Sequence, residues 1–461
     1  MNARSRWLLI AVGLGVLLNP LNSSMIAVAI ARLQHEYRLD FTEVSWIIFT
    51  FYIASSIAQP VMGKASDLFG RKKIFLTGLA VVSVASLIAP FSPSFGWLIV
   101  FRILQAIGTS MMVAVGMAIV RVHITEKQAT ALSVLAMFLS GAAAIGPFVG
   151  GVLLHWWDWQ AIFFVNIPFV VASFLFAWRN IPDDAPPKST TQGMSLRKWG
   201  EFIDVQGLLL FTVGLVGVLI GLLSATSSGH VSLGVVIVGL LGLIALGFFV
   251  RHELKTTSPF IPVRAFAKYP AMTLVNVEFI LVNLLYYSLF FGFPSYLQMV
   301  RHVSEVDTGM LMLSLGLCSL VVSPLAGRWI DKTGPRPALL LSAILMTLGS
   351  VWIVTLDESS PVISVSLVLA VFGISSGLNN VGMQAALFRS SPKEMIGIAS
   401  GLFMTSRYLG TILSSLLLGI VMGDRLSAEG FRMLGVILAI VALTLVIMSW
   451  RRREPKQIEQ S

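Results

Sequence analysis

One carboxyl group, that of Glu278, stands in the middle of a long apolar run, in the stretch LVNVEFILVN at residues 274–283. An acidic charge at the centre of a membrane helix costs about 2.5–3.5 kcal/mol on insertion scales. A carboxyl group placed there is therefore neutral for part of the time or paired with a cation. Arg407 lies in another apolar run at a similar expected depth, which makes it the best-placed partner.

Three kinds of chemistry are open to Glu278. It could carry a proton by alternating between a protonated and a paired state, form a fixed ion pair with Arg407, or hold a cationic ligand directly. Helical periodicity places Asn276 and Asn283 on one face and Glu278 about 200° away from them. The face of Glu278 is apolar apart from Tyr286. Proton coupling by Glu278 with Arg407 is our leading hypothesis.

A second group of polar side chains lies inside apolar runs and could line an internal cavity that binds a small molecule. Polar side chains in membrane helices also form hydrogen bonds between helices, so both explanations stay open. The candidates for the cavity are Asn22, Ser24, Arg102, Gln105, Tyr286, Asn379 and Asn380.

Long membrane helices are needed to position these residues, and the amino-acid composition indicates that the chain forms them. Of the 461 residues, 56% are hydrophobic and 12% are charged, which is typical of integral membrane proteins. A spanning helix needs about 20 apolar residues, and the alternating segments of a membrane barrel are missing. The sequence therefore predicts an all-α membrane protein with fourteen spanning helices, near residues 7–31, 44–62, 74–92, 96–120, 130–154, 161–178, 204–224, 231–250, 271–297, 308–327, 338–356, 362–386, 396–421 and 431–450.

The distribution of Lys and Arg between alternate loops predicts the orientation. With the N-terminus in the cytoplasm, most of the 32 Lys and Arg residues fall in inner segments. The outer segments then hold Arg32, Arg38, Arg301, Arg425 and Arg432. We expect both termini to be cytoplasmic, the first helix to be uncleaved, and the membrane to be the inner membrane of a bacterium.

Several functional classes are disfavoured. The single cysteine, Cys318, excludes an intramolecular disulfide and a cysteine-based metal site, and the six histidines lack ligand spacing. No Walker-type phosphate loop is present, and no cluster of His, Asp or Ser suggests an enzyme. The net charge of +10 resides in the inner loops and does not mark a nucleic-acid surface. We expect no enzyme activity, cofactor, metal or nucleic-acid partner, and a monomer.

Two loops of the sequence repeat each other. GKASDLFGRKK begins at Gly63 and GRWIDKTGPRP begins at Gly327. Glycine in such a loop allows a tight reversal, an acid can cap a helix end, and the basic residues, Arg71 among them, hold the loop on the inner face. A fixed offset indicates an internal duplication, and three pairs share the offset of 264 residues: Gly63/Gly327, Asp67/Asp331 and Gly70/Gly334.

The number of helices between the two loops predicts the domain organisation. Eight helices separate them where a simple duplication would place six, so two helices are inserted near the middle, after a polar linker at 180–202. We expect a six-helix bundle at 1–180, the linker and inserted pair at 181–262, and a second six-helix bundle with a basic tail at 263–461.

These motifs resemble those of the major facilitator superfamily. GKASDLFGRKK is similar to its signature between helices 2 and 3, and RILQAIGTS to its helix 4 motif. The stretch GAAAIGPFVGG is similar to the helix 5 motif of antiporters, in which small residues allow close helix contact and proline favours a bend. Its residues here are Gly141, Gly146, Pro147, Gly150 and Gly151.

One branch, the 14-spanner drug:proton antiporters, is the most similar. The stretches WDWQAIFFVNIPF and SGLFMTSRYLG and the inserted helix pair carry this resemblance. It implies proton-coupled efflux of hydrophobic or amphipathic drugs by alternating access. That branch commonly has an acidic residue in helix 1 where this chain has Asn22. The alternative is therefore a lipid or metabolite exporter that is not coupled to protons.

Overall fold

The computed structural model describes residues 3–124, 128–183, 204–227, 233–256, 259, 261, 263–357, 359–391, 396–422 and 427–452. Regular structure in this part of the chain is entirely helical, and 14 segments of it are long and apolar enough to cross a membrane. The prediction of an all-α membrane protein with fourteen spans is confirmed. Most of the expected linker at 180–202 lies outside the described residues.

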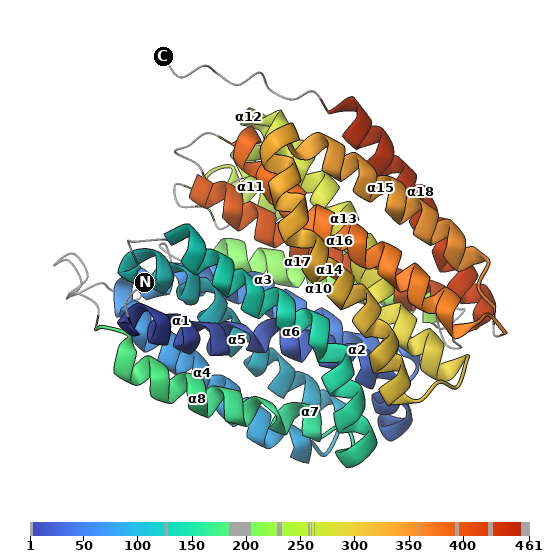
Figure 1. Ribbon diagram of the computed structural model, residues 1–461, viewed down its shortest axis with the longest axis horizontal. Helices are drawn as coiled ribbons and strands as arrows, with labels where there is room; N and C mark the ends of the chain where they lie inside the picture. Colours follow the sequence, from blue (N-terminus) through green and yellow to red (C-terminus); the bar gives the residue numbers. More distant parts are fainter. Residues whose placement is uncertain are drawn as a thin grey trace. The chain divides into compact units, whose positions relative to one another are not determined.

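The chain forms two compact units (Figure 1). The N-terminal unit comprises residues 1–39 and 43–260, and the C-terminal unit comprises residues 40–42 and 261–461. The first unit contains α1 (Ala3–Val16), α2 (Leu18–Tyr37), most of α3 (Phe41–Phe69), α4 (Arg71–Ile88), η1 (Ala89–Phe91), α5 (Phe95–His123), α6 (Gln128–Trp157), α7 (Ala161–Phe164), α8 (Asn166–Asn180), α10 (Val205–Ser227) and α11 (Leu233–Glu253). The second contains α12 (Val263–Lys268), α13 (Pro270–Met299), α14 (Glu305–Thr333), α15 (Pro335–Val354), α16 (Val362–Ser390), α17 (Ile396–Met422) and α18 (Ala428–Arg451).

The two repeated loops have the same helical surroundings, and the internal duplication itself stays a prediction. α3 and α14 are both 29 residues long, and each is followed by a single glycine and then by the next helix. Gly70 has φ 95° and Gly334 has φ 83°, values that side chains with a Cβ rarely adopt. Glycine at these two positions therefore permits the helix-to-helix reversal that the sequence predicted.

Glycines also set the closest helix contacts inside the N-terminal unit. α4 packs on α5 where a Cβ on Gly78 would lie 2.8 Å from the Gly108 oxygen. α6 packs on α2 where a Cβ on Gly146 would collide with the Ser24 side chain and one on Gly150 would lie 3.1 Å from the Met25 backbone. Pro147 is accommodated within the continuous helix α6. The small-residue motif of α6 thus acts in helix packing, as its composition predicts.

The C-terminal unit is built from three closely packed helix pairs: α14 with α16, α13 with α17, and α15 with α18. Gly373 of α16 and Gly410 of α17 allow two of these contacts, since a Cβ would lie 2.3 Å from the Leu315 oxygen and 2.5 Å from the Ile280 oxygen. These pairs fix the directions in which the polar side chains of α13, α15 and α17 point.

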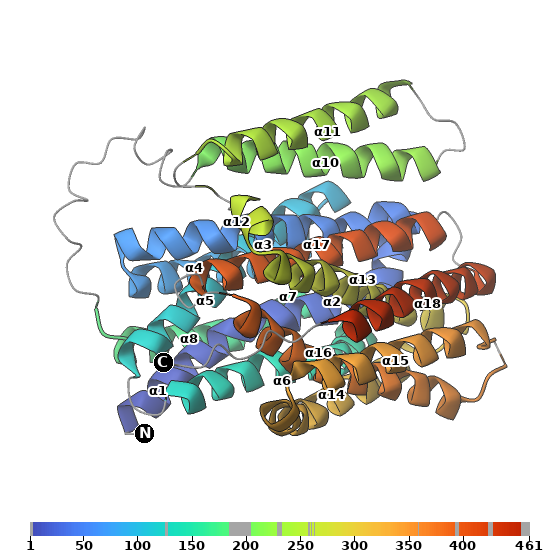
Figure 2. The same cartoon turned by 90° about the horizontal axis from the view of Figure 1, so that it is seen from above.

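The inserted helices α10 and α11 form a hairpin and pack chiefly against each other (Figure 2). Gly217 and Gly221 of α10 face Gly242 and Gly239 of α11, with backbone atoms 2.6–3.0 Å from a hypothetical Cβ. At one end of the hairpin the His252 Nε2 and Asp204 Oδ1 atoms are 2.6 Å apart. The helices themselves are apolar, as predicted, and the titratable groups lie at their ends.

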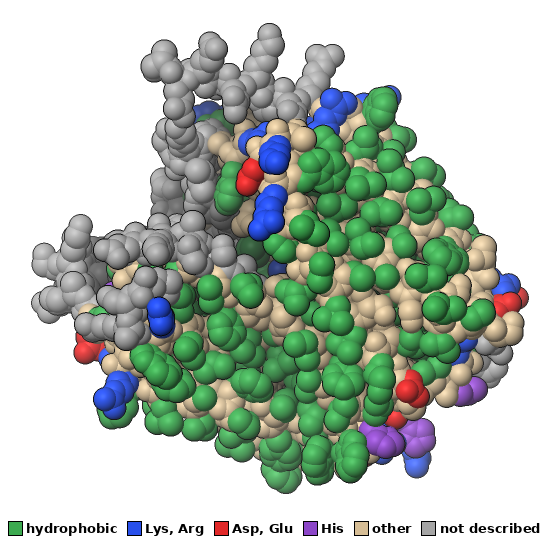
Figure 3. All heavy atoms as spheres, viewed as in Figure 1, with side chains coloured by type: hydrophobic (Ala, Val, Ile, Leu, Met, Phe, Trp, Pro, Cys, Tyr) green, Lys and Arg blue, Asp and Glu red, His purple; other side chains and the backbone are tan. Residues whose placement is uncertain are grey.

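Large hydrophobic side chains are exposed on many helices, with Trp178 65%, Leu241 57% and Val321 61% accessible. On the face seen in Figure 3, hydrophobic side chains cover most of the described surface and charged ones gather near its margins. Soluble proteins rarely expose this much apolar surface. The exposed surface therefore fits contact with lipid.

Candidate functional site

Buried polar side chains from four helices of the N-terminal unit form a hydrogen-bonded network. Arg102 Nη1 donates to Gln105 Oε1 at 2.6 Å, and Gln105 Nε2 donates to Asn22 Oδ1 and Ser86 Oγ at 3.0 Å each. Asn166 exchanges two hydrogen bonds with Asn22, at 2.8 and 2.9 Å. All five side chains are buried. The network joins α2, α4, α5 and α8, and it unites Asn22, Arg102 and Gln105 among the predicted cavity residues.

Main-chain carbonyls determine the orientation of both asparagine amides. Asn22 Nδ2 also donates to the Leu18 oxygen at 2.7 Å, and Asn166 Nδ2 donates to the Phe163 oxygen at 3.0 Å. A carbonyl oxygen can only accept, so the nitrogen of each amide is identified. The oxygen of Asn22 then faces Gln105 and Asn166. At this place the chain has amides that cannot take up and release a proton.

Arg102 is a buried cation with neutral neighbours. Its Cζ atom lies 4.5 Å from the centroid of the Phe51 ring, and its Nε atom has no hydrogen-bond partner among the described residues. No described carboxylate forms an ion pair with it. A desolvated cation–π contact contributes about 2 kcal/mol, less than the several kcal/mol lost on burying an ion. The positive charge of Arg102 is thus only partly compensated by the described residues.

In the C-terminal unit, Glu278 is completely buried in α13 and forms an ion pair with Arg452, which follows α18 directly. Arg452 Nη2 donates to Glu278 Oε2, whereas Oε1 accepts no hydrogen bond from a described residue. This partner corrects the expectation that Arg407 forms the pair. Depth alone favoured Arg407, but the end of α18 lies close enough for a long arginine side chain to reach Glu278.

Arg407 lies against a different part of α13. Its Nη2 atom donates to the Tyr287 hydroxyl at 2.8 Å. The preceding residue, Ser406, donates to Asn276 Oδ1 at 2.9 Å. α17 therefore faces the asparagine side of α13, and Glu278 points to another side, as helical periodicity indicated. The proton-coupling role of Glu278 and Arg407 stays a prediction.

The other predicted cavity residues have varied surroundings. Asn379 Nδ2 donates to Ser342 Oγ at 2.6 Å, which ties α16 to α15. Ser24 is buried where α2 meets Gly146 of α6. Tyr286 stacks on Phe290 with ring centroids 5.8 Å apart, and Asn380 is exposed. Contact of these side chains with a substrate stays a prediction.

The remaining motif residues lie at helix ends or within helices. Gly63 and Gly141 have no atom within 4 Å of a hypothetical Cβ, and Gly327 has only a contact at 3.9 Å. Arg71 begins α4, Asp331 is exposed near the end of α14, and Gly151 is buried in α6. The side chain of Asp67 lies outside the described part of the chain.

Sequence reasoning missed three residues of these two sites. Asn166 is an isolated amide in the apolar stretch FFVNIPF, and that isolation was a usable signal. Ser86 gave no signal, because serine is unremarkable in a membrane helix. Arg452 belongs to the basic tail at the end of the chain, and its neighbours Arg451 and Arg453 made it look like an ordinary inner-side charge.

The architecture and the sequence both have known counterparts. The family model of the Major Facilitator Superfamily matches residues 12–415 and 279–461. The chain belongs to this superfamily. An uncharacterized MFS-type transporter of Bacillus subtilis (strain 168), YwoD, is 44% identical over 443 residues, which are 96% of each protein. The tetracenomycin C resistance and export protein of Streptomyces glaucescens is 28% identical over 424 residues, 90% of this chain and 76% of that protein.

A solved structure of the superfamily shares the fold. The crystal structure of the peptide transporter POT matches with a TM-score of 0.71 at 15% identity, over 96% of this chain and 94% of that one. Major facilitator proteins are membrane transporters of small molecules and are not enzymes. The chain is accordingly a multi-pass transporter, as its sequence motifs predicted.

Proposed function

We propose that this transporter is a 14-spanner antiporter that exports hydrophobic or amphipathic compounds in exchange for protons by alternating access. The observation that carries the proposal is the buried carboxyl group of Glu278. Such an exchange needs a group inside the membrane that takes up and releases a proton. Among the described residues of the C-terminal unit, Glu278 is the buried acid. The resemblance to the tetracenomycin C resistance and export protein supports a drug-like cargo.

The same proposal includes a location and an assembly state. We place the protein in the inner (cytoplasmic) membrane of a bacterium as a monomer, with both termini in the cytoplasm. The Bacillus relative supports the bacterial setting. The distribution of Lys and Arg between alternate loops supports the orientation.

A second candidate is an exporter of lipids or metabolites that is not coupled to protons. The amide network around Asn22 favours it, because the described residues of that network include no carboxylate. If coupling requires an acid in the N-terminal unit, this chain lacks it at Asn22. The two candidates differ in whether cargo movement depends on Glu278.

The deciding experiment measures proton flux in proteoliposomes that contain a pH-sensitive dye. Ethidium, a hydrophobic cation, serves as the probe cargo. We expect ethidium-dependent proton flux with the natural side chains and at least a tenfold loss in Glu278→Gln, because the amide cannot exchange a proton. Glu253→Gln is the matched control, since Glu253 is also a buried acid but ends the inserted helix α11.

Each outcome separates the candidates. Loss of flux in Glu278→Gln with ethidium binding retained supports coupling through Glu278. Equal flux in both variants and in the natural protein moves the coupling group elsewhere. Ethidium transport without proton flux in any of the three favours the uncoupled exporter.

A further inference from the structure

The C-terminal end of α18 is held by two arginine contacts of different kinds. Arg336 Nη2 donates to the main-chain oxygen of Trp450 at 2.6 Å, and Arg452 pairs with Glu278. The first contact joins a permanently charged group to a carbonyl dipole, and it is independent of proton concentration. The second disappears when the carboxylate of Glu278 takes up a proton.

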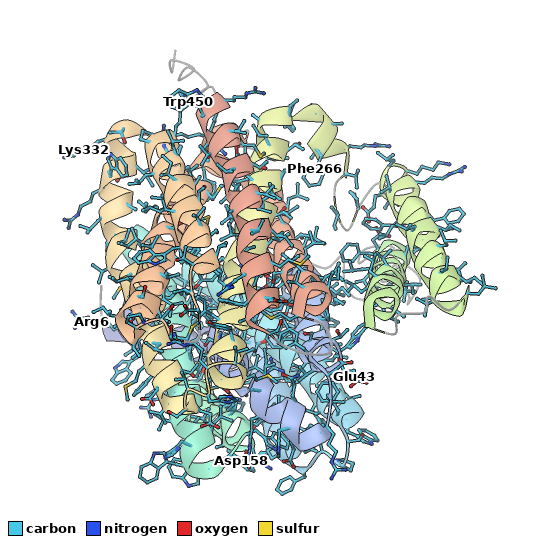
Figure 4. All side chains as sticks on the ribbon, turned by 90° about the vertical axis from the view of Figure 1, so that its right-hand side faces the viewer. Arg6, Glu43, Asp158, Phe266, Lys332 and Trp450 are labelled. Carbon is cyan, nitrogen blue, oxygen red and sulfur yellow. The ribbon has the colours of Figure 1, made fainter. Side chains whose placement is uncertain are left out.

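Both contacts lie at one end of the C-terminal unit. Figure 4 shows Phe266, Lys332 and Trp450 together at that end. Arg336 is part of the second repeated loop, and it lies in the first turn of α15, which packs along α18. The end of α18 is thus connected to the loop on one side and to the buried acid of α13 on the other.

One carboxyl oxygen of Glu278 is available to take up a proton. Its Oε1 atom is buried and accepts no hydrogen bond from a described residue. A buried polar atom without a partner costs about 1–3 kcal/mol, and more when it is charged. A proton on Oε1 removes the part of that cost that is due to the charge, and it also removes the attraction that holds Arg452. Arg452 can then turn its charged end to water, because its long side chain is already 10% exposed in the closed pair.

We propose that Arg452 and a proton compete for Glu278, so that the end of α18 is a latch that closes on the carboxylate and opens when a proton from solution binds there. The latch rests on the proposed function in one respect, namely that Glu278 exchanges a proton. It adds the group that the proton displaces, and it assigns a moving element to the coupling step. Arg452 acts here through Glu278 and is a positioning residue.

Glu278 is the acidic group within this contact, and the charged groups around it are mainly basic. The helices packed against α13 carry mainly basic residues at this end of the unit. Among the described ones, the additional carboxylate is that of Asp331, which is exposed at the end of α14. The charged and titratable groups on α12, α14, α16, α17 and α18 and directly before α13 are Arg264, Lys268, Tyr269, Glu305, Asp307, Cys318, Arg328, Asp331, Lys332, Arg389, Arg407, Tyr408, Glu429, Arg432 and Arg451, of which Glu305, Asp307, Glu429 and Arg432 lie in the first turns of α14 and α18, at the opposite end of those helices from Asp331 and Arg451.

Thiol labelling of the last turn of α18 tests the latch directly. Ser449 is 3% exposed, so Ser449→Cys in a Cys318→Ser background places one buried thiol beside the contact. The rate of reaction with a water-soluble maleimide is measured in lipid nanodiscs between pH 5 and pH 8. At every pH it is divided by the rate in the same protein with Glu278→Gln, which cancels the titration of the thiol itself.

We expect this ratio to be about 0.1 at the highest pH, where the pair is closed, and to approach one as the pH falls. A ratio of labelling rates that equals one at every pH, or one that stays low at every pH, overturns the latch. Ala442→Cys is the control position, because Ala442 is buried two turns earlier in α18. Equal acceleration at Ala442 and Ser449 also overturns the proposal, since it indicates that the whole helix moves.

Two further variants keep the test decisive. Arg452→Gln, which leaves the acid in place, should label as fast as Glu278→Gln at every pH. Arg336→Gln should raise the rate a few-fold but keep the pH response, because the ion pair remains.

The labelling readout is independent of transport. A pH-dependent labelling ratio together with normal proton flux in Glu278→Gln supports the latch and contradicts the coupling proposal. A labelling ratio that does not change with pH, together with loss of proton flux in Glu278→Gln, overturns the latch and supports the coupling proposal.

Discussion

The N-terminal unit buries the cation Arg102 against an amide oxygen and a phenyl ring, whereas the C-terminal unit buries the acid Glu278 against the guanidinium of Arg452. In the first site the neighbours are dipoles that stay neutral. In the second, one partner can lose its charge by taking up a proton. The two sites therefore differ in the kind of change that each can undergo.

This difference assigns separate chemical abilities to the two units. Arginine keeps its proton in proteins, so Arg102 contributes a constant positive field. A carboxylate can be switched off by a proton, and the partner it releases can move. The network of Arg102 thus differs from the Glu278 site in containing no described carboxylate, although the N-terminal unit also buries Asp204 and Glu253 at the ends of α10 and α11. The two units thus carry unlike chemistry.

The largest expected effect compares the stability cost of removing each buried charge. Glu278→Ala leaves Arg452 without its acid, and breaking a buried pair costs about 3–5 kcal/mol. The cost should fall at the lower end of this range, because the Arg452 side chain is 10% exposed and can reach water once the acid is gone. Arg102→Met should change the free energy of unfolding by no more than about 1 kcal/mol. Removing a poorly compensated buried charge is favourable, and this offsets the loss of the hydrogen bond that Gln105 Oε1 accepts from Arg102. Reversible unfolding in mixed micelles measures both.

The double variant Glu278→Leu with Arg452→Leu is the control for this comparison. It removes both charges, so most of the stability lost in Glu278→Ala should return. If Arg102→Met destabilises the protein as much as Glu278→Ala does, the two units bury charge in the same way and the contrast between them is wrong.

A smaller effect is expected from making the N-terminal site resemble the C-terminal one. Asn22→Asp removes the hydrogen bonds to the Leu18 oxygen and to Asn166, which should cost about 1–3 kcal/mol at neutral pH. The loss should shrink as the pH falls, because a protonated acid can donate one of these bonds again. Proton flux per ethidium in proteoliposomes should rise, since Arg102 then has an acid within its network.

Asn379→Asp is the matched control in the C-terminal unit, where Asn379 donates to Ser342. It also buries a new acid, but in a hydrogen bond to a serine rather than in the Arg102 network, so it should lower stability without raising the flux ratio. An unchanged flux ratio in Asn22→Asp would show that the amide network has no part in proton movement.

Much of the architecture could be predicted from the sequence because membrane helices obey local rules. Apolar length predicted the fourteen spans, and glycine spacing predicted the reversals at Gly70 and Gly334, where φ is positive. Helical periodicity also separated Glu278 from Asn276 before any contact was known. Each of these features depends on residues close together in the chain.

The partners within the sites could not be predicted in the same way. Residue depth made Arg407 the expected partner of Glu278, but depth does not tell which helix ends lie beside α13. The Arg452 contact depends on the packing of α18, and the pairing of Asn22 with Asn166 joins residues 144 apart. Such contacts depend on tertiary packing, to which a single sequence gives no direct access.

The smallest expected effect concerns a charge pair that water can reach. Asp158, in the turn between α6 and α7, accepts two hydrogen bonds from Arg32, at 2.8 and 2.6 Å, and one from the Trp159 N–H. The Arg32 hydrogen bond holds the pKa of the Asp158 carboxyl below its ordinary value, although partial burial opposes this. Asp158 also has φ 74°, which asparagine tolerates well.

Because the folded pKa is depressed, the stabilisation by Asp158 is present above the ordinary carboxyl pKa of about 3.9 and is lost as the pH falls through the folded value. Side chains exposed by 40% and 33% are screened by water, so Asp158→Asn should cost only about 0.5–1 kcal/mol at pH 7. Thermal unfolding in detergent at pH 7 and well below a pH of about 3.9 should show the gap in Tm narrowing at the lower pH. A gap that widens instead would mean that the charge of Asp158 is unfavourable in the folded protein, and that even half-exposed pairs here behave like the buried charge of Arg102.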